Sequence, residues 1–224
     1  MLDKLDQLKD YTYYFQFTLN AYGRDVETGF RRKTMLSYSA FQKLSDMIGP
    51  KRVIWRYDPI FINKTYTFEY HLHYFEQLAK RLSPYTEKCT ISFLIFTAIR
   101  SETLPPLPST VSRPNYRKVW QKIWRPSPKS YGLKVDTCAE NIDLQKYGIE
   151  HARCIDDRLF SELLGSPLTV GKDKNQRLEC SCIESLDIGA YNTCRNAANT
   201  VTPISVPKPF VETPVFMIRS HRFS

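Results

Sequence analysis

The feature that most constrains this fold is a repeated alternation of strand-like and helix-like patterns along the chain. Aromatic and β-branched runs, typical of buried strands, begin near residues 12, 52, 88 and 132. Apolar residues at helical spacing follow in 34–48 and 66–82. Repeats of about 35–45 residues have the size of βα units. We therefore predict an α/β fold, built as an incomplete (βα) repeat of the TIM-barrel type.

Two segments do not follow this alternation. Residues 94–128 and 197–224 together hold ten of the 14 prolines and carry +7 of the net charge of +9. A structureless stretch of about 35 residues is unusual inside a compact repeat. We predict one partial α/β domain over 1–196, interrupted by an irregular proline-rich, basic segment at 94–128, and an irregular tail at 197–224.

Composition and charge exclude several classes of protein. Because no stretch of about 18 apolar residues occurs, we expect no membrane partner. The first residues are charged and lack the apolar core of a signal peptide, so we expect a cytoplasmic protein with reduced thiols. Lys118, Trp120, Lys122 and Trp124 imitate a nucleic-acid-binding stripe, but they lie in the irregular segment. We therefore do not expect a nucleic-acid partner.

The cysteines are the main candidates for chemistry. Cys180, Cys182 and Cys194 fall within fifteen residues, and clustered thiolates are typical of zinc or iron–sulfur sites. Cys138 and Cys154 follow predicted strand ends, where barrel folds place their chemistry. Cys138, Cys154, Cys180 and Cys182 are therefore candidate ligands of zinc or of an auxiliary iron–sulfur cluster. The alternative is that they are buried thiols without a ligand, as we expect of Cys89.

A charged pair in the WRYDP motif is a second candidate. Arg56 and Asp58 lie near the end of a predicted strand, where they could hold a substrate carboxylate or a cofactor ribose. The alternative is an internal salt bridge that orders the strand end. Glu140, close to Cys138, is a weaker candidate for the same kind of polar contact.

Several motifs together resemble a known family. They are YYFQFTLNAYG, WRYDP, YGLKVDTCAENIDL, CIDD and CSC…DIGAYNTC. They are similar to the bacterial family named domain of unknown function 1848, whose cysteine motif is similar to that of radical S-adenosylmethionine enzymes. The resemblance implies a barrel-like α/β fold, a [4Fe–4S] cluster, S-adenosylmethionine, and a small-molecule or macromolecular substrate that is not identified. It also implies that Cys194 is the first cluster ligand of a C-x3-C-x2-C motif.

This chain departs from the family pattern after Cys194, because no further thiol follows. Codons that encode AANTVTP can also encode GCKYCYA when the reading frame is shifted by one base. That alternative sequence contains the expected cysteines. We interpret 94–128 and 197–224 as out-of-frame translations, and the chain as truncated at its start. We expect it to be inactive and to bind no cluster; the catalytic residues and the oligomeric state are not indicated. The alternative is a small metal-binding module, for zinc or an auxiliary cluster, or a nucleic-acid-binding module.

Overall fold

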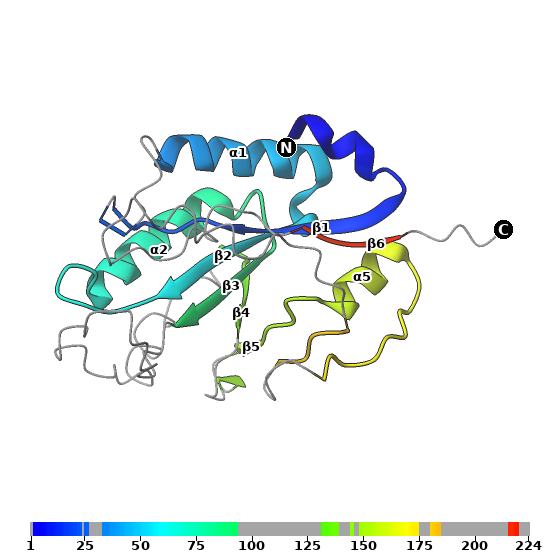
Figure 1. The fold of residues 1–224 in the computed structure, drawn as a ribbon. Coiled ribbons are helices and arrows are strands. Elements are labelled where there is room, and N and C mark those ends of the chain that lie inside the picture. The colour runs from blue at the N-terminus through cyan, green and yellow to red at the C-terminus, as the bar shows by residue number, and fades with distance from the viewer. Residues whose placement is uncertain are drawn as a thin grey trace, which may run out of the picture.

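The chain folds around one mixed sheet (Figure 1). The computed structural model describes residues 2–23, 25–26, 33–93, 131–138, 144–145, 148–174, 180–184 and 215–219. The strands are β1 (Tyr11–Thr18), β2 (Val53–Ile60), β3 (Lys88–Phe93), β4 (Lys134–Thr137), β5 (Glu150–His151) and β6 (Val215–Arg219). The helices are α1 (Lys33–Ile48), α2 (Phe68–Leu82) and α5 (Asp157–Leu164), with 3₁₀ helices η1 (Leu2–Leu8) and η2 (Pro50–Arg52).

The sheet confirms the predicted α/β alternation. Its strand order is β5-β4-β3-β2-β1-β6, so each parallel strand lies beside its neighbour in sequence. Strands β1 to β5 pair in parallel, and helices α1 and α2 connect β1 to β2 and β2 to β3. The predicted proline-rich segment at 94–128, together with Glu140 and Cys194, lies outside the described residues.

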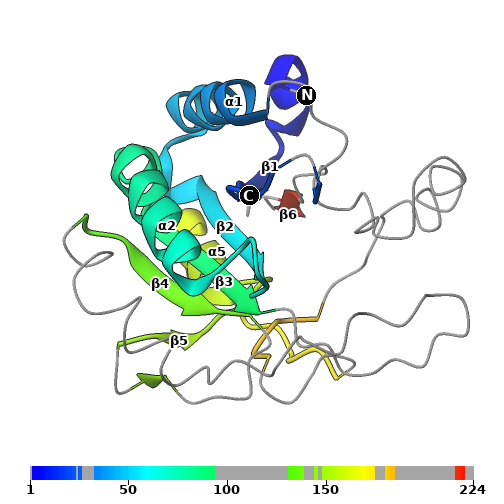
Figure 2. The same ribbon diagram turned by 90° about the vertical axis from the view of Figure 1, so that its left-hand side faces the viewer.

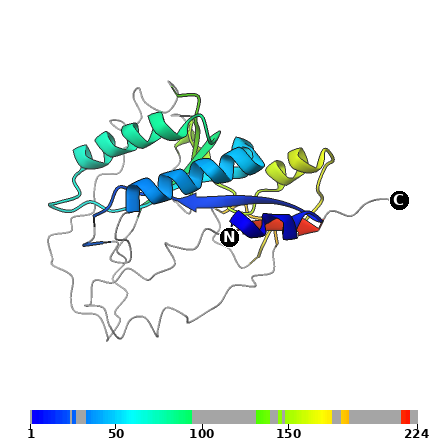
Figure 3. The ribbon, with the colours of Figure 1, turned by 90° about the horizontal axis from the view of Figure 1, so that it is seen from above.

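One face of the sheet packs against α1 and α2, which run side by side (Figures 2 and 3). Phe41 of α1 meets Phe17 of β1 with ring centroids 5.2 Å apart. Phe75 of α2 stacks on Trp55 of β2 at 5.0 Å. These rings belong to the main apolar core, and each fully buried side chain of this size contributes about 1.5–3 kcal/mol to stability. Buried residues of β1 to β4 all contribute to this core.

The opposite face carries α5 and several buried polar side chains. Phe160 of α5 packs on Tyr14 of β1 at 5.1 Å, in a second, smaller apolar cluster. Because strand side chains alternate between faces, the residues flanking Tyr14 point toward α1 and α2 instead. The same face carries the following buried polar residues: Gln16, Asp58, Thr90 and Asp136. A sheet face with buried polar side chains is where a site can form.

The element ends differ slightly from those predicted, for local reasons. The predicted helix at 66–82 begins at Phe68 because the Thr67 side chain caps it, accepting a hydrogen bond from the Tyr70 N–H at 3.2 Å. The strand predicted near residue 12 spans Tyr11–Thr18. Beyond it, side chains satisfy the backbone: the Trp55 indole N–H donates to the Leu19 carbonyl at 3.0 Å. The strand predicted from 131 begins at Lys134, after Gly132 turns the chain with a φ of 71°.

The prediction of a wholly irregular tail is wrong at its end. Val215–Arg219 forms β6, which pairs antiparallel with β1 from Tyr11↔Arg219 to Phe15↔Val215. This VFMIR run follows the last proline of the tail, Pro214, and it is apolar and partly β-branched. Such a run has the composition of a strand, and β1 offers it a backbone edge.

Candidate functional site

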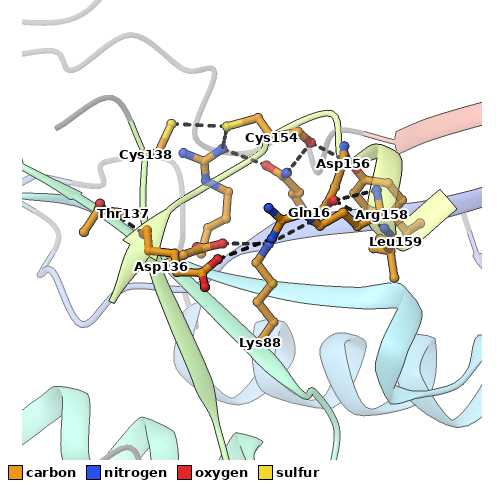
Figure 4. A network of polar contacts seen from close by, with 12 residues as sticks. Gln16, Lys88, Asp136, Thr137, Cys138, Cys154, Asp156, Arg158 and Leu159 are labelled. Atoms are coloured by element: carbon orange, nitrogen blue, oxygen red, sulfur yellow. Dashed lines mark hydrogen bonds and ion pairs between the residues drawn. The ribbon is translucent and has the colours of Figure 1, made fainter. Parts of the chain in front are cut away.

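Three thiols meet at the carboxyl edge of the parallel sheet. Cys138 directly follows β4, where its N–H donates to the Ile91 carbonyl of β3 at 2.8 Å. Cys154 lies three residues after β5, and its Sγ is 3.2 Å from the Sγ of Cys138 (Figure 4). The Cys182 thiol is hydrogen-bonded to Cys154 as well. Parallel α/β folds bind ligands at this edge, so the thiols stand where chemistry is expected.

Backbone contacts bring Cys182 to this edge from a distant part of the sequence. The Ile183 N–H donates to the Ile155 carbonyl at 3.3 Å, next to Cys154. The Asp173 N–H donates to the Cys182 carbonyl at 3.0 Å, within a short antiparallel bridge. Cys182 is therefore anchored on both sides, and its sulfur faces the loop that follows β5.

Strand β1 positions Cys154 through two side chains. The Tyr14 hydroxyl donates to the Cys154 carbonyl at 2.6 Å, and the Gln16 amide donates to the same oxygen at 2.7 Å. The Asp156 N–H in turn donates to the Tyr14 hydroxyl at 3.0 Å. Sequence reasoning missed both Tyr14 and Gln16. The available signal was Gln16 itself, an amide within an otherwise aromatic buried strand.

Arg56 and Asp58 lie beside the thiols, and they pair with each other. The Arg56 guanidinium binds Asp58 through two nitrogens, one of them Nε at 3.0 Å, and donates to the side-chain amide oxygen of Gln16 at 2.7 Å. Its Nη1 is also 3.8 Å from the Cys154 sulfur. Burial opposes the charge of Arg56, but Asp58 and the neighbouring thiols raise its pKa above the usual range. The internal salt bridge is therefore present, while a role in binding a carboxylate or ribose stays a prediction.

The three thiols have different proton affinities. A hydrogen bond from Cys154 lowers the pKa of Cys138 to about 7 against the effect of burial, with help from Arg56. A hydrogen bond from Cys154 likewise lowers the pKa of Cys182 to about 6. Hydrogen bonding with Cys138 and Cys182, together with partial burial, raises the pKa of Cys154, whose single S–H donates to one neighbour at a time. Near neutral pH, the outer thiol that accepts this hydrogen bond thus gains thiolate character, and thiolates are the form that binds metals and reacts with oxidants.

A charged network continues from the thiols across the sheet face (Figure 4). Lys88 of β3 lies between two carboxylates, 2.6 Å from Asp136 of β4 and 3.2 Å from Asp156. Burial opposes the charge of Lys88, but these two carboxylates raise its pKa. Burial also raises the pKa of Asp136, although Lys88 opposes that shift. Sequence reasoning missed Lys88 and Asp136, whose signal was a charge inside an apolar strand.

The network lines a cavity of about 550 Å³ between α5 and the sheet. Its described lining contains five Lys or Arg side chains and five Asp or Glu side chains, so it favours neither anions nor cations. Two buried atoms of lining residues, Oδ1 of Asp136 and Nδ1 of His151, have no hydrogen-bond partner within the described chain. The cavity therefore offers two polar atoms without hydrogen-bond partners but no preference for one charge. The thiols are thus the stronger candidate for a functional site.

The structure brings together three of the four predicted metal-site cysteines. Cys138, Cys154 and Cys182 are adjacent, and Cys180 is buried two residues before Cys182. Cys89 is buried in the main apolar core, as predicted. Within the described ranges, no three His, Cys, Asp or Glu side chains are already arranged to hold a metal ion.

Comparison with known proteins adds one finding. A model of a domain of unknown function, DUF1848, matches residues 1–199. The chain belongs to the DUF1848 family. This confirms the membership predicted from WRYDP and DIGAYNTC. Searches of curated proteins and of solved structures found no match for this DUF1848 chain. Of the helices that the structure describes, none is long and apolar enough to cross a membrane.

The donors after Cys194 do not fit the [4Fe–4S] cluster that the resemblance implies. In a C-x3-C-x2-C motif starting at Cys194, the second and third ligands would stand at Ala198 and Val201. Neither side chain can bind iron, so one thiol remains where three are needed. Any metal chemistry of this DUF1848 chain must therefore be sought at the other cysteines.

Proposed function

We propose that this chain binds one thiophilic divalent metal ion, zinc above all, through Cys138, Cys154 and Cys182. The observation that carries the proposal is the meeting of three thiols from separate segments, two of them with lowered pKa values. Thiolates are preferred zinc ligands, and tetrahedral zinc needs three or four such donors.

The spacing of the sulfurs favours a single ion over a cluster. Two thiolates bound at about 2.3 Å to a tetrahedral ion are about 3.8 Å apart. The Cys138 and Cys154 sulfurs are 3.2 Å apart, so binding requires them to separate by only about 0.6 Å. In a cubane cluster each cysteine binds a different iron, so the sulfurs stand farther apart. The fourth position of the ion is left to solvent, a substrate group or a further ligand.

The family-level part of the proposal is a barrel-like protein that resembles radical S-adenosylmethionine enzymes. The polar inner face of the sheet and the two helices on its outer face support a barrel-like arrangement. The missing thiols at Ala198 and Val201 support the absence of radical chemistry in this copy. The nucleotide sequence of codons 93–129 and 196–224 tests the out-of-frame interpretation. Wobble bases that exclude cysteine codons in the alternate frame would refute it.

Metal analysis of the purified chain tests the site. We expect about one zinc per chain after gel filtration, and a thiolate-to-cobalt charge-transfer band when cobalt replaces zinc. Cys138→Ser, Cys154→Ser and Cys182→Ser should each lower metal retention at least tenfold. Cys89→Ala is the matched control, because this thiol lies in the apolar core and its loss should leave metal content unchanged.

Two outcomes would reject this function. One is zinc retention that survives all three serine variants. The other is a folded wild-type chain, monitored by circular dichroism, that retains no zinc or cobalt. If reconstitution with iron and sulfide under anaerobic conditions instead gives a broad visible absorption that depends on these cysteines, the site holds a cluster and not a single ion.

A further inference from the structure

Of the three thiols, Cys154 is the one that contacts both of the others. Cys154 contacts Cys138 at 3.2 Å, and it also hydrogen-bonds to Cys182. Each of the two outer thiols thus has Cys154 as its neighbour. A shared central sulfur can bond to either outer sulfur, but not to both at once.

We propose that Cys154 forms a reversible disulfide with Cys138 and can transfer it to Cys182 by thiol–disulfide exchange, with low-molecular-weight disulfides as the oxidant. The three residues would then act as a relay at the carboxyl edge of the sheet. The regulatory consequence rests on the proposed metal site: a disulfide removes two of its three ligands and releases the ion.

Geometry and exposure support bond formation at this pair first. A disulfide joins sulfurs at about 2.05 Å, so Cys138 and Cys154 must approach by about 1 Å, which small side-chain rotations supply. Both thiols are half-buried, whereas Cys89, Cys180 and Cys182 are buried. A small oxidant therefore reaches the Cys138–Cys154 pair, while Cys182 reacts through Cys154.

The chemistry balances without a further reactant. One thiolate of the pair attacks the oxidant disulfide, breaking its S–S bond and releasing one small thiolate, which takes up a proton. The second thiolate then attacks the mixed disulfide and releases the second small thiol. Two protein S–H bonds are replaced by one S–S bond, and both electrons and both protons end on the reduced oxidant. For exchange, the Cys182 thiolate attacks Cys154 and frees Cys138 as a thiolate.

Peptide mapping of the metal-free full chain in glutathione redox buffers tests the relay. Cleavage after Lys134 and Arg153 places Cys138 and Cys154 in separate tryptic peptides, and Cys180, Cys182 and Cys194 share the peptide 178–195. The wild type and Cys182→Ser should give the Cys138–Cys154 link. Cys138→Ser should link Cys154 to peptide 178–195, and adding Cys182→Ser should remove that link. Cys154→Ser should abolish all links between these peptides.

The outcomes separate the relay from the metal site. No Cys138–Cys154 link over the full range of redox buffers, or a Cys138 link to peptide 178–195 in Cys154→Ser, overturns the relay. In the zinc-loaded chain, we expect oxidised glutathione to release zinc in step with the link, as read by a colorimetric chelator. A chain that forms the link but binds no zinc refutes only the metal site, and one that binds zinc but never forms the link refutes only the relay.

Discussion

His71 of α2 shows how a single buried side chain sets a pH dependence. Its Nε2 lies 3.0 Å from the Phe61 carbonyl and its Nδ1 lies 2.9 Å from the Tyr57 hydroxyl. Because a carbonyl only accepts, Nε2 carries the proton and Nδ1 accepts from Tyr57 in the neutral ring. Burial lowers the pKa of His71 to about 4, although the hydrogen bond to Phe61 opposes that shift.

We predict that the chain loses stability as the pH falls through the window from about 6.5 to about 4. The unfolded chain protonates His71 near pH 6.5 and the folded chain only near pH 4, so the unfolded state binds the extra proton between them. The contribution is complete above the upper limit and amounts to about 3 kcal/mol. Urea denaturation of the wild type and His71→Gln at pH 7 and pH 4.5 measures it.

The exposed His73 on the same helix supplies the control for this prediction. Its side chain is hydrogen-bonded to Gln77 at the surface, so His73→Gln should leave the pH dependence intact. An unchanged slope in His71→Gln would show that other groups cause the loss of stability at acidic pH.

At the scale of one element, the N-cap residue of helix α5, Asp156, makes two kinds of contact. Asp156 caps the helix by accepting from the N–H groups of Arg158 at 3.1 Å and Leu159 at 3.3 Å. Its other carboxylate oxygen pairs with Lys88 of β3. Asp before an apolar run is a standard helix start, so the cap has a local signal in the sequence. The pairing with Lys88, 68 positions away, has none.

Two substitutions should separate these contributions of Asp156. Asp156→Asn keeps a capping acceptor but removes the charge, so we expect it to lose the ion pair alone. Asp156→Ala loses both, and should lower the free energy of unfolding by about 1–2 kcal/mol more than Asp156→Asn. Denaturant titration at low salt measures both values. Equal losses in the two variants would mean that the cap contributes nothing.

Predictability differs among the elements for physical reasons. The starts of strands β2 and β3 were predicted within one residue, because both runs are rich in β-branched and aromatic residues. The two-residue β5 is too short to leave a periodic pattern, so its bounds were not predicted, although a strand end was placed at Cys154. The site was predicted in part: strand ends pointed to Cys138 and Cys154, but no local pattern tells which distant thiol joins them. Cys182 reaches them through contacts that only the folded chain makes.

At the scale of the whole molecule, β6 joins the tail to the first strand. It covers the edge of β1 that β2 leaves free. An uncovered edge strand presents unpaired backbone groups and is a template for association with other chains. The tail is therefore a structural part of the sheet, whatever the reading frame of the segment that leads to it.

Proline substitutions in β6 test this role. In an antiparallel pair, successive N–H groups of an edge strand point alternately toward its neighbour and away from it. Phe216→Pro and Met217→Pro therefore differ: one loses a hydrogen bond to β1, about 1 kcal/mol, and the other does not. Alanine at each position corrects for the lost side chain, and denaturant titration gives the difference. Identical effects of the two prolines would show that β6 does not pair with β1.

The pairing of β1 with β6 also affects the order in which the sheet can assemble during synthesis. Tyr11 pairs with Arg219, 208 positions later, so β1 leaves the ribosome long before its outer partner is made. The helices and the parallel neighbours of β1 can assemble earlier, from segments close in sequence. During translation the edge of β1 thus stays unpaired until β6 is made. A chaperone that acts in this interval would bind at that edge.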